Sequence, residues 1–295
     1  MVENLAGKRA EMSTILVTGA TGRVGRHVVQ GLLEAGATVR ALVRNPEAAE
    51  LPAPVEVVQG DLYDPGAVEG AAVGVDAVFL LWPSFSAEGA ETAVKALTKH
   101  VSRVVYLSSL NVRDDQPLAA GGVWGELEEL LADFDWTFLR PSGFAVNTQA
   151  WAEAFRTSDV VRIPFPGAGR SLIHERDLAA VAVLALLDPQ HIGQKYLLTG
   201  PEVLTQAEQI AILSTVTGKP MRIEEQSPTE ARQTMLALGA DPTLADSSVA
   251  YWSTLVTNPE PVTPAVPALL NRPALTYHDW SEEHVDEFLG SLPSN

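Results

Sequence analysis

Three glycines near the start of the sequence have the spacing of a dinucleotide-binding turn. A β-branched apolar run at residues 15–18 leads into Gly19, Gly22 and Gly25, and an apolar pattern of helical period follows. In such a turn the glycines allow a tight strand-to-helix reversal, a close approach to a pyrophosphate and close packing of the helix on the strand. The free N–H groups of the helix N-terminus then attract the anion. A glycine-rich turn in an unrelated α/β protein is the alternative interpretation.

The end of the next apolar run discriminates between the two nicotinamide dinucleotides. Residues 41–45 read Ala-Leu-Val-Arg-Asn, so no acid is present to accept from the adenosine ribose and to repel a 2′-phosphate. Arg44 instead offers a guanidinium fork to a 2′-phosphate, and Arg23 in the glycine turn is a second candidate. We therefore expect NADP(H) as the preferred cofactor, with NAD(H) as the alternative.

These residues need a parallel sheet to bring them together. Continuous apolar runs alternate with helical patterns, which is typical of a parallel sheet covered on both faces. Right-handed crossovers then predict an α/β fold with a doubly wound parallel Rossmann sheet. The expected strands are residues 15–18, 38–43, 55–59, 76–81, 103–108 and 136–139, and the expected helices are 24–35, 65–71, 88–99 and 123–132.

Ligands bind outside the carboxyl ends of the strands in such a sheet. Asp61 and Leu62 follow the third expected strand, where they face the adenine, and the Asp61 carboxylate can accept from its exocyclic amine. A turn or N-cap role for Asp61 is compatible with this contact. Leu81 and Trp82 follow the fourth strand, where we expect them to border the cofactor ribose.

The pattern loosens after residue 140. The expected elements there are helices at 148–155, 177–187, 205–216, 227–238 and 281–289 and a strand at 194–199, and Thr205 and Glu208 have the spacing of a capping box. We expect a disordered N-terminal extension at residues 1–12 and an NAD(P)-binding Rossmann domain at 13–145. A smaller C-terminal α/β substrate lobe at 146–295 is interwoven with that domain.

Composition excludes several classes of function. The 295 residues contain no cysteine, which excludes thiolate nucleophiles and zinc–sulfur sites, and the histidines lack metal-ligand spacing. The formal net charge of −17 argues against nucleic-acid binding, which needs a basic face. The sequence has no apolar run of about 18 residues, so a membrane span is not expected. A cytoplasmic location follows as the default, for a monomer or homodimer.

Seven segments together resemble the NmrA-like group of atypical short-chain dehydrogenases/reductases. The matching segments are residues 18–25, 39–46, 60–62, 105–110, 137–144, 173–180 and 198–201. The group includes NAD(P)H-dependent quinone and triphenylmethane-dye reductases and also cofactor-binding redox sensors. The resemblance implies that the whole glycine turn contacts the cofactor, namely Thr18, Gly19, Thr21, Gly22, Arg23, Val24 and Gly25.

The resemblance also assigns the residues beside the nicotinamide. Ser108 and Ser109 stand at the position of the family serine, whose hydroxyl can polarise a substrate carbonyl. Glu128 matches a family glutamate, and Trp124 stands where relatives carry a histidine, so these four residues are the catalytic candidates. No Tyr-x-x-x-Lys motif follows the fifth strand. The cofactor also contacts a segment after the sixth strand, and the predicted residues there are Pro141, Ser142 and Phe144.

The favoured function is an NADPH-dependent reductase that transfers hydride to a small quinone-, dye- or enone-like acceptor. Such acceptors are already electrophilic, so the missing Tyr/Lys pair is tolerable. Aromatic side chains supply flat walls for a ring system, and the predicted pocket residues are Phe85, Trp124, Phe144, Asn147 and Trp151. A non-catalytic NADP(H)-binding sensor and a tailoring reductase or isomerase of secondary metabolism stay open as alternatives.

Overall fold

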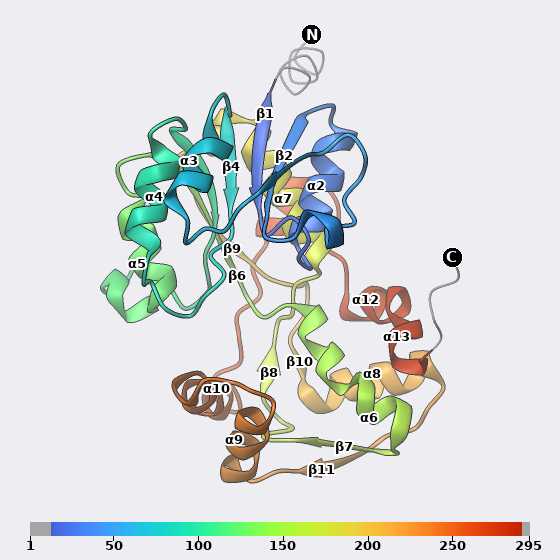
Figure 1. Cartoon of the computed structure of the whole chain (residues 1–295). Helices are drawn as coiled ribbons and strands as arrows, with labels where there is room; N and C mark the ends of the chain where they lie inside the picture. Colours follow the sequence, from blue (N-terminus) through green and yellow to red (C-terminus); the bar gives the residue numbers. More distant parts are fainter. Residues whose placement is uncertain (1–12, 291–295) are drawn as a thin grey trace. The chain divides into compact units, whose positions relative to one another are not determined.

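The computed structural model describes residues 13–290, which form two units (Figure 1). Unit 1 comprises residues 13–141 and 175–198, and unit 2 comprises residues 142–174 and 199–290. The chain therefore leaves unit 1 shortly before the expected boundary at residue 145 and returns to it for one helix and one strand. The extension expected at residues 1–12 lies outside the described residues.

Unit 1 is built on a parallel sheet of seven strands in the order β3-β2-β1-β4-β5-β6-β9. The strands are β1 (Thr14–Thr18), β2 (Thr38–Val43), β3 (Glu56–Gln59), β4 (Ala77–Leu80), β5 (Arg103–Leu107), β6 (Asp135–Pro141) and β9 (Lys195–Leu198). The central strands are apolar on both faces, and Ile15, Leu16 and Val17 of β1 are fully buried. This burial requires helices on both sides of the sheet.

Helices cover both faces, which confirms the predicted doubly wound α/β fold. Helix α2 packs against α7 on one face, and α3, α4 and α5 follow one another on the other face (Figure 1). The helices of unit 1 are α2 (Gly25–Glu34), α3 (Pro65–Ala72), α4 (Ala90–Thr98), α5 (Val123–Leu130) and α7 (Glu175–Leu187), with 3₁₀ turns η1 (Pro46–Ala48), η2 (Leu118–Gly121) and η4 (Pro189–His191).

Unit 2 is a mixed α/β unit with two small two-stranded sheets. Strand β8 (Gly169–Arg170) pairs antiparallel with β10 (Leu204–Thr205), and β7 (Val160–Ile163) pairs parallel with β11 (Arg222–Glu225). Its helices are η3 (Ala145–Trp151), α6 (Ala152–Thr157), α8 (Gln206–Thr217), α9 (Pro228–Ala237), α10 (Pro242–Thr254), α11 (Ala265–Leu270), α12 (Tyr277–Glu283) and α13 (Val285–Leu289). Their core centres on Phe155, Trp280 and Phe288.

Helix starts in unit 2 follow the capping chemistry of the sequence. The capping box expected at Thr205 and Glu208 is confirmed, since each side chain accepts from the other residue's backbone N–H. The helix expected at 148–155 is a 3₁₀ segment followed by α6, and the one expected at 281–289 is split into α12 and α13. Among residues 13–290, no helix combines the length and apolar character needed to cross a bilayer.

The glycine turn between β1 and α2 depends on one very close backbone contact. A Cβ atom at Gly25 would lie 2.0 Å from the carbonyl oxygen of Gly19, far inside contact distance. Gly19 itself has φ +65°, a left-handed conformation that glycine adopts without steric cost. A side chain at Gly25 therefore has to push α2 away from the turn.

This contact predicts opposite effects for two glycine-to-alanine substitutions in helices. Gly25→Ala should destabilise the protein by about 1–3 kcal/mol through overpacking and weaken NADPH binding. Gly70→Ala, in α3 with open space around its Cβ position, should stabilise it by about 0.5–1 kcal/mol through helix propensity. Urea unfolding and cofactor titration measure both. A Gly25→Ala protein as stable as the parent, with unchanged NADPH affinity, would contradict the importance of the close contact between Gly25 and the Gly19 carbonyl.

Candidate functional site

The glycine turn is held against the neighbouring strand β4 by a threonine. The Thr18 hydroxyl, at the end of β1, accepts from the backbone N–H of Leu81 at 2.8 Å, and it lies 3.2 Å from the carbonyls of Phe79 and Leu81. Within the turn, the Gly22 N–H donates to the Gly19 carbonyl at 2.9 Å. Helix α2 begins at Gly25 without a side-chain cap. The N–H groups of Arg26, His27 and Val28 donate to the carbonyls of Gly22 and Val24, so an anion can be bound by the backbone N–H groups just before them, those of Val24 and Gly25.

A cavity of about 240 Å³ lies at the carboxyl ends of β1, β2, β3 and β4. It brings together seven residues that the sequence predicted as cofactor contacts and adds five that border them. The predicted residues are Thr18, Gly19, Thr21, Arg44, Asp61, Leu62 and Leu81, and the added ones are Leu42, Val43, Gly60, Tyr63 and Pro83. Its glycine floor, apolar walls and single arginine fit the adenosine half of a dinucleotide.

Two charged side chains, those of Arg44 and Asp61, line the cavity. Arg44 is exposed, and no acidic side chain of residues 13–290 pairs with its guanidinium group. Arg23 is exposed in the glycine turn itself. The Asp61 carboxylate accepts from the backbone N–H of Tyr63 at 3.0 Å, which fixes the turn after β3. Arg44 therefore lines the cavity with an exposed guanidinium group, and its contact with a 2′-phosphate stays a prediction.

Trp82 does not line this cavity. Its side chain is buried in the core of unit 1, its indole N–H donates to the Ser86 carbonyl at 2.8 Å, and its ring meets Tyr63 edge-on at 5.3 Å. The neighbours Leu81 and Pro83 line the cavity instead. Successive residues after a strand point to opposite sides, which separates Trp82 from Leu81.

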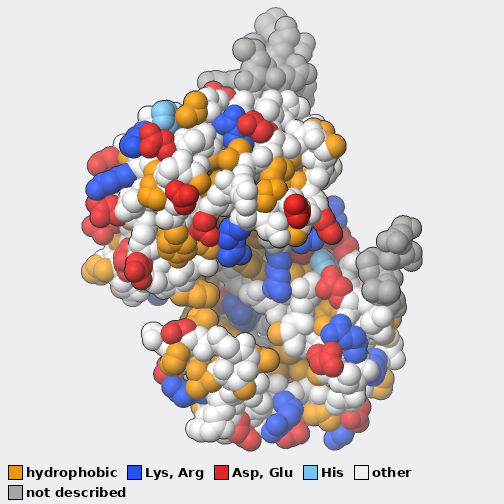
Figure 2. Space-filling view, viewed as in Figure 1, with side chains coloured by type: hydrophobic (Ala, Val, Ile, Leu, Met, Phe, Trp, Pro, Cys, Tyr) orange, Lys and Arg blue, Asp and Glu red, His pale blue; other side chains and the backbone are white. Residues whose placement is uncertain are grey.

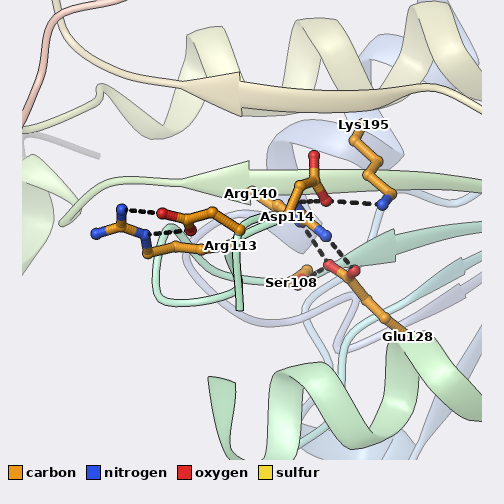
Figure 3. Close-up of polar contacts among 7 residues, drawn as sticks. Ser108, Arg113, Asp114, Glu128, Arg140 and Lys195 are labelled. Atoms are coloured by element: carbon orange, nitrogen blue, oxygen red, sulfur yellow. Dashed lines mark hydrogen bonds and ion pairs between the residues drawn. The ribbon is translucent and has the colours of Figure 1, made fainter. Parts of the chain in front are cut away.

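A buried ion pair joins Arg140 to Glu128, the glutamate that the sequence predicts beside the nicotinamide (Figure 3). Arg140 on β6 donates from Nε to Oε1 of Glu128 at 2.8 Å and from Nη2 to Oε2 at 2.6 Å. Both side chains are almost fully buried, at 5% and 1% exposure. The Ser108 hydroxyl, at the end of β5, lies 2.6 Å from the same Oε1. Three separate elements, β5, α5 and β6, thus meet at one carboxylate.

A second carboxylate extends this network toward the surface. Asp114 accepts from Nη1 of Arg140 at 3.0 Å and from Nζ of Lys195 at 2.8 Å (Figure 3). Hydrogen bonds from Lys195 and then from Arg140 lower the pKa of Asp114. Burial disfavours the charged form of Arg140, but hydrogen bonds and charge from Glu128, and then from Asp114, raise its pKa overall. The network therefore contains two cations and two anions.

Tyr106 lies in β5 two residues before Ser108, and it is fully buried. Its hydroxyl has no hydrogen-bond partner among the described residues. Burial, followed by the negative charge of Glu128, raises its pKa above the ordinary value for tyrosine. Tyr106 therefore stays protonated and packs in the core of unit 1.

The predicted aromatic residues fall into both units. In unit 1, Phe85 is 63% exposed and meets the half-buried Trp124 of α5 edge-on, with ring centroids 5.8 Å apart. In unit 2, the half-buried Phe144 and Trp151 pack against the core, and Asn147 is exposed on η3. Pro141 was expected after the sixth strand but is the last residue of β6, and its carbonyl accepts from the N–H of Leu110. Ser142 follows β6, and its hydroxyl donates to the carbonyl of Ser171.

Three members of this network, Arg140, Asp114 and Lys195, were not predicted from the sequence. A signal was present for Arg140, because an arginine inside an otherwise apolar strand has to find an acid when it is buried.

Within residues 13–290, no group of three His, Asp or Glu side chains could hold a metal ion. On the face drawn in Figure 2, basic side chains are interspersed with acidic ones.

Comparison with known proteins identifies the family of this chain. Residues 19–189, more than half of the chain, match a family model described as NAD(P)H-binding. The chain belongs to this NAD(P)H-binding family. Membership confirms the resemblance inferred from the motifs, and it confirms NAD(P)H as the cofactor.

Two curated members of the family are similar over nearly their whole length. A (4-alkanoyl-5-oxo-2,5-dihydrofuran-3-yl)methyl phosphate reductase of Streptomyces griseus is 39% identical over 282 residues, 93% of this chain and 99% of the relative. An NAD(P)H azoreductase of Xenophilus azovorans is 34% identical over 284 residues, with the same coverage. The solved NADPH-dependent quinone oxidoreductase of Escherichia coli is 26% identical with a TM-score of 0.76, covering 91% of this chain and 98% of its own.

The free guanidinium of Arg44 predicts a cofactor-specific defect. Arg44→Gln should raise the Kd for NADPH about 10- to 100-fold, because a charge-assisted hydrogen bond is worth about 1.5–3 kcal/mol. The Kd for NADH should change far less, since NADH has no 2′-phosphate. Fluorescence titration with each cofactor measures the effect. Arg222→Gln, an exposed arginine outside the cavity, is the matched control, and equal losses for both cofactors would contradict the assignment.

The unpaired hydroxyl of Tyr106 predicts that its removal is harmless. Tyr106→Phe should leave stability unchanged or raise it, because a buried hydroxyl without a partner costs about 1–3 kcal/mol of desolvation. Tyr277→Phe is the matched control, since its buried hydroxyl donates to Thr148 at 2.9 Å. The control should lose about 1 kcal/mol. Urea unfolding compares the two, and an equal loss in both would indicate that Tyr106 has a polar partner.

Proposed function

We propose that the protein is an NADPH-dependent reductase that transfers hydride to a quinone-, dye- or enone-like small organic acceptor. One observation carries the proposal: the carboxylate expected beside the nicotinamide, Glu128, is committed to Arg140 and Ser108. It is therefore not a free general acid. An acceptor that is already electrophilic, and that collects its proton from water, needs no such acid.

NADPH supplies the hydride when it is bound, and the chain's residues bind and orient it. The glycine turn and the N-terminus of α2 hold the pyrophosphate, and Arg44 holds the 2′-phosphate. Ser108 and Ser109 follow β5 at the carboxyl edge of the sheet, where ligands of such folds bind. The exposed Phe85 and its partner Trp124 offer a flat apolar surface to a conjugated ring. Positioning of this kind accounts for a large part of the rate in hydride transfer.

The substrates named for the relatives share one electronic property that supports this proposal. An azo group, a quinone and a dihydrofuranone that carries an alkanoyl group all have an electron-poor double bond in conjugation. Each can spread the charge that arrives with hydride over several atoms. We extend this class to the present chain, acting as a cytoplasmic monomer or homodimer.

A panel of acceptors tests the proposal. The purified protein should oxidise NADPH in the presence of menadione, a triphenylmethane dye, an azo dye or an acyl butenolide, as measured by the loss of absorbance at the NADPH band. A simple ketone such as cyclohexanone should give little turnover, because its charge would have to develop on one oxygen without a proton donor.

The same panel distinguishes the sensor alternative, which the tryptophan at position 124 favours. A sensor should bind NADPH but turn over none of the acceptors. That outcome, with binding confirmed by titration, would overturn the reductase proposal.

A further inference from the structure

Arg170, on β8 of unit 2, is a half-buried arginine that pairs with a buried acid. Its guanidinium group donates to Oε1 of Glu260, from Nε at 3.2 Å and from Nη2 at 3.1 Å. The side chain of Arg170 is 18% exposed and that of Glu260 only 1%. The pair therefore lies where the interior of the unit meets solvent, with the acid on the inner side.

Glu260 occupies only one edge of the guanidinium plane. An arginine has five N–H groups, and the pair uses two of them, on Nε and on Nη2. The second N–H of Nη2 and one N–H of Nη1 form a parallel pair on the next edge. Among residues 13–290, no group accepts a hydrogen bond from Nη1. Such an edge matches two oxygens of a carboxylate, sulfonate or phosphate group.

Two further donors fix the position of Glu260 and thereby that of the guanidinium group. The backbone N–H of Ser171 donates to Oε2 at 3.0 Å, and the Tyr251 hydroxyl donates to Oε1 at 2.8 Å. Burial, followed by the charge of Glu260, raises the pKa of Tyr251, so this hydroxyl keeps its proton and can donate. An anion that binds Arg170 therefore meets a donor whose orientation is already set, which lowers the entropic cost of binding.

The guanidinium group lies directly against a segment in which the sequence predicts acceptor-binding residues. A Cβ atom at Gly143 would lie 2.0 Å from Nη2 and 2.4 Å from Cζ of Arg170, so only a glycine leaves room for the guanidinium group. Gly143 precedes Phe144, a predicted pocket residue, and both are half-buried. Hydrogen bonds with Ile173 hold this segment beside β8. Arg170 thus contacts the residue next to an aromatic residue of the predicted pocket.

We propose that Arg170 is a recognition residue for the acceptor, and that the protein prefers conjugated acceptors that carry a carboxylate, sulfonate or phosphate group. This inference rests on the proposed reductase function. The parallel N–H groups bind two oxygens of the anionic group, and Phe144 contacts the ring system that carries it. Glu260 is a positioning residue. The anionic group takes no part in the reaction, and its binding orients the acceptor for hydride transfer.

Two quinones that differ in one substituent test the proposal. 1,4-Naphthoquinone-2-sulfonate carries the anionic group where menadione carries a methyl group. In Arg170→Gln, the ratio of kcat/KM with the sulfonate to kcat/KM with menadione should fall about 10- to 100-fold, because a hydrogen bond to a charged group is lost. The loss should appear as a raised KM for the sulfonate. Arg162→Gln, an exposed arginine of β7 in the same unit, is the matched control and should keep the ratio of the parent.

Two further variants separate recognition from folding. Arg170→Lys keeps the positive charge but lacks the parallel N–H groups, so it should restore only part of the ratio. Tyr251→Phe removes one donor to Glu260 and leaves the guanidinium group in place. It should lower the melting temperature and change the ratio much less than Arg170→Gln does. An equal fall of the ratio in Tyr251→Phe and Arg170→Gln would show that the pair acts only on the structure and would overturn the proposal.

A titration without turnover tests the same contact. Naphthalene-2-sulfonate and naphthalene-2-sulfonamide share one ring system and differ in charge. The parent protein with bound NADPH should bind the sulfonate about tenfold more tightly, and Arg170→Lys should lose most of this preference. Equal affinity of the parent for both compounds would overturn the proposal, whether or not the Arg170→Gln protein folds. A parent protein that reduces neither quinone refutes the proposed function instead, and the titration still tests Arg170.

Discussion

The carboxyl edge of the sheet in unit 1 depends on the buried ion pair between Glu128 and Arg140. Removing both charges from water costs several kcal/mol per ion, so the pair is stable only with nearly complete hydrogen bonding. Ser108 and Asp114 supply the remaining partners. Loss of either member would leave an uncompensated buried charge at a cost of about 3–5 kcal/mol. The pair thus fixes β5, α5 and β6 in one arrangement, and Lys195 links β9 to it.

Elements with a strong apolar or capping signal were predictable from the sequence. Every strand of the main sheet was expected within a few residues, and for the central strands β1, β4 and β5 the reason is burial on both faces, which leaves a continuous apolar run. The starts of α8 and α9 follow capping boxes and, for α9, a proline at the first turn. Strands β7, β8, β10 and β11 were not predicted. The residues of β11 are all exposed and β8 has only two, so neither shows the alternation that identifies a strand.

In the candidate site too, features set by neighbouring residues in the sequence were predictable, and features set by contacts between distant elements were not. The glycine turn and Arg44 are local features, and the cavity contains both. Glu128 belongs to an acidic run with Glu126 and Glu129, yet it alone of the three is buried. What distinguishes it is the contact with Arg140, which comes from another element of the fold. Trp82 was expected at the ribose because of its position after β4, but the alternation of side chains turns it into the core.

The same network limits the chemistry of the site. Arg140 and Glu128 hold each other in a bidentate pair, and Tyr106 is buried with a raised pKa. All three side chains are buried. Ser108 and Ser109 follow β5 at the carboxyl edge of the sheet, and a hydroxyl group can donate a hydrogen bond. A donor of that kind stabilises charge that is already delocalised over a conjugated acceptor, whereas an isolated ketone would need the full proton transfer that the missing Tyr/Lys pair provides elsewhere in the wider family.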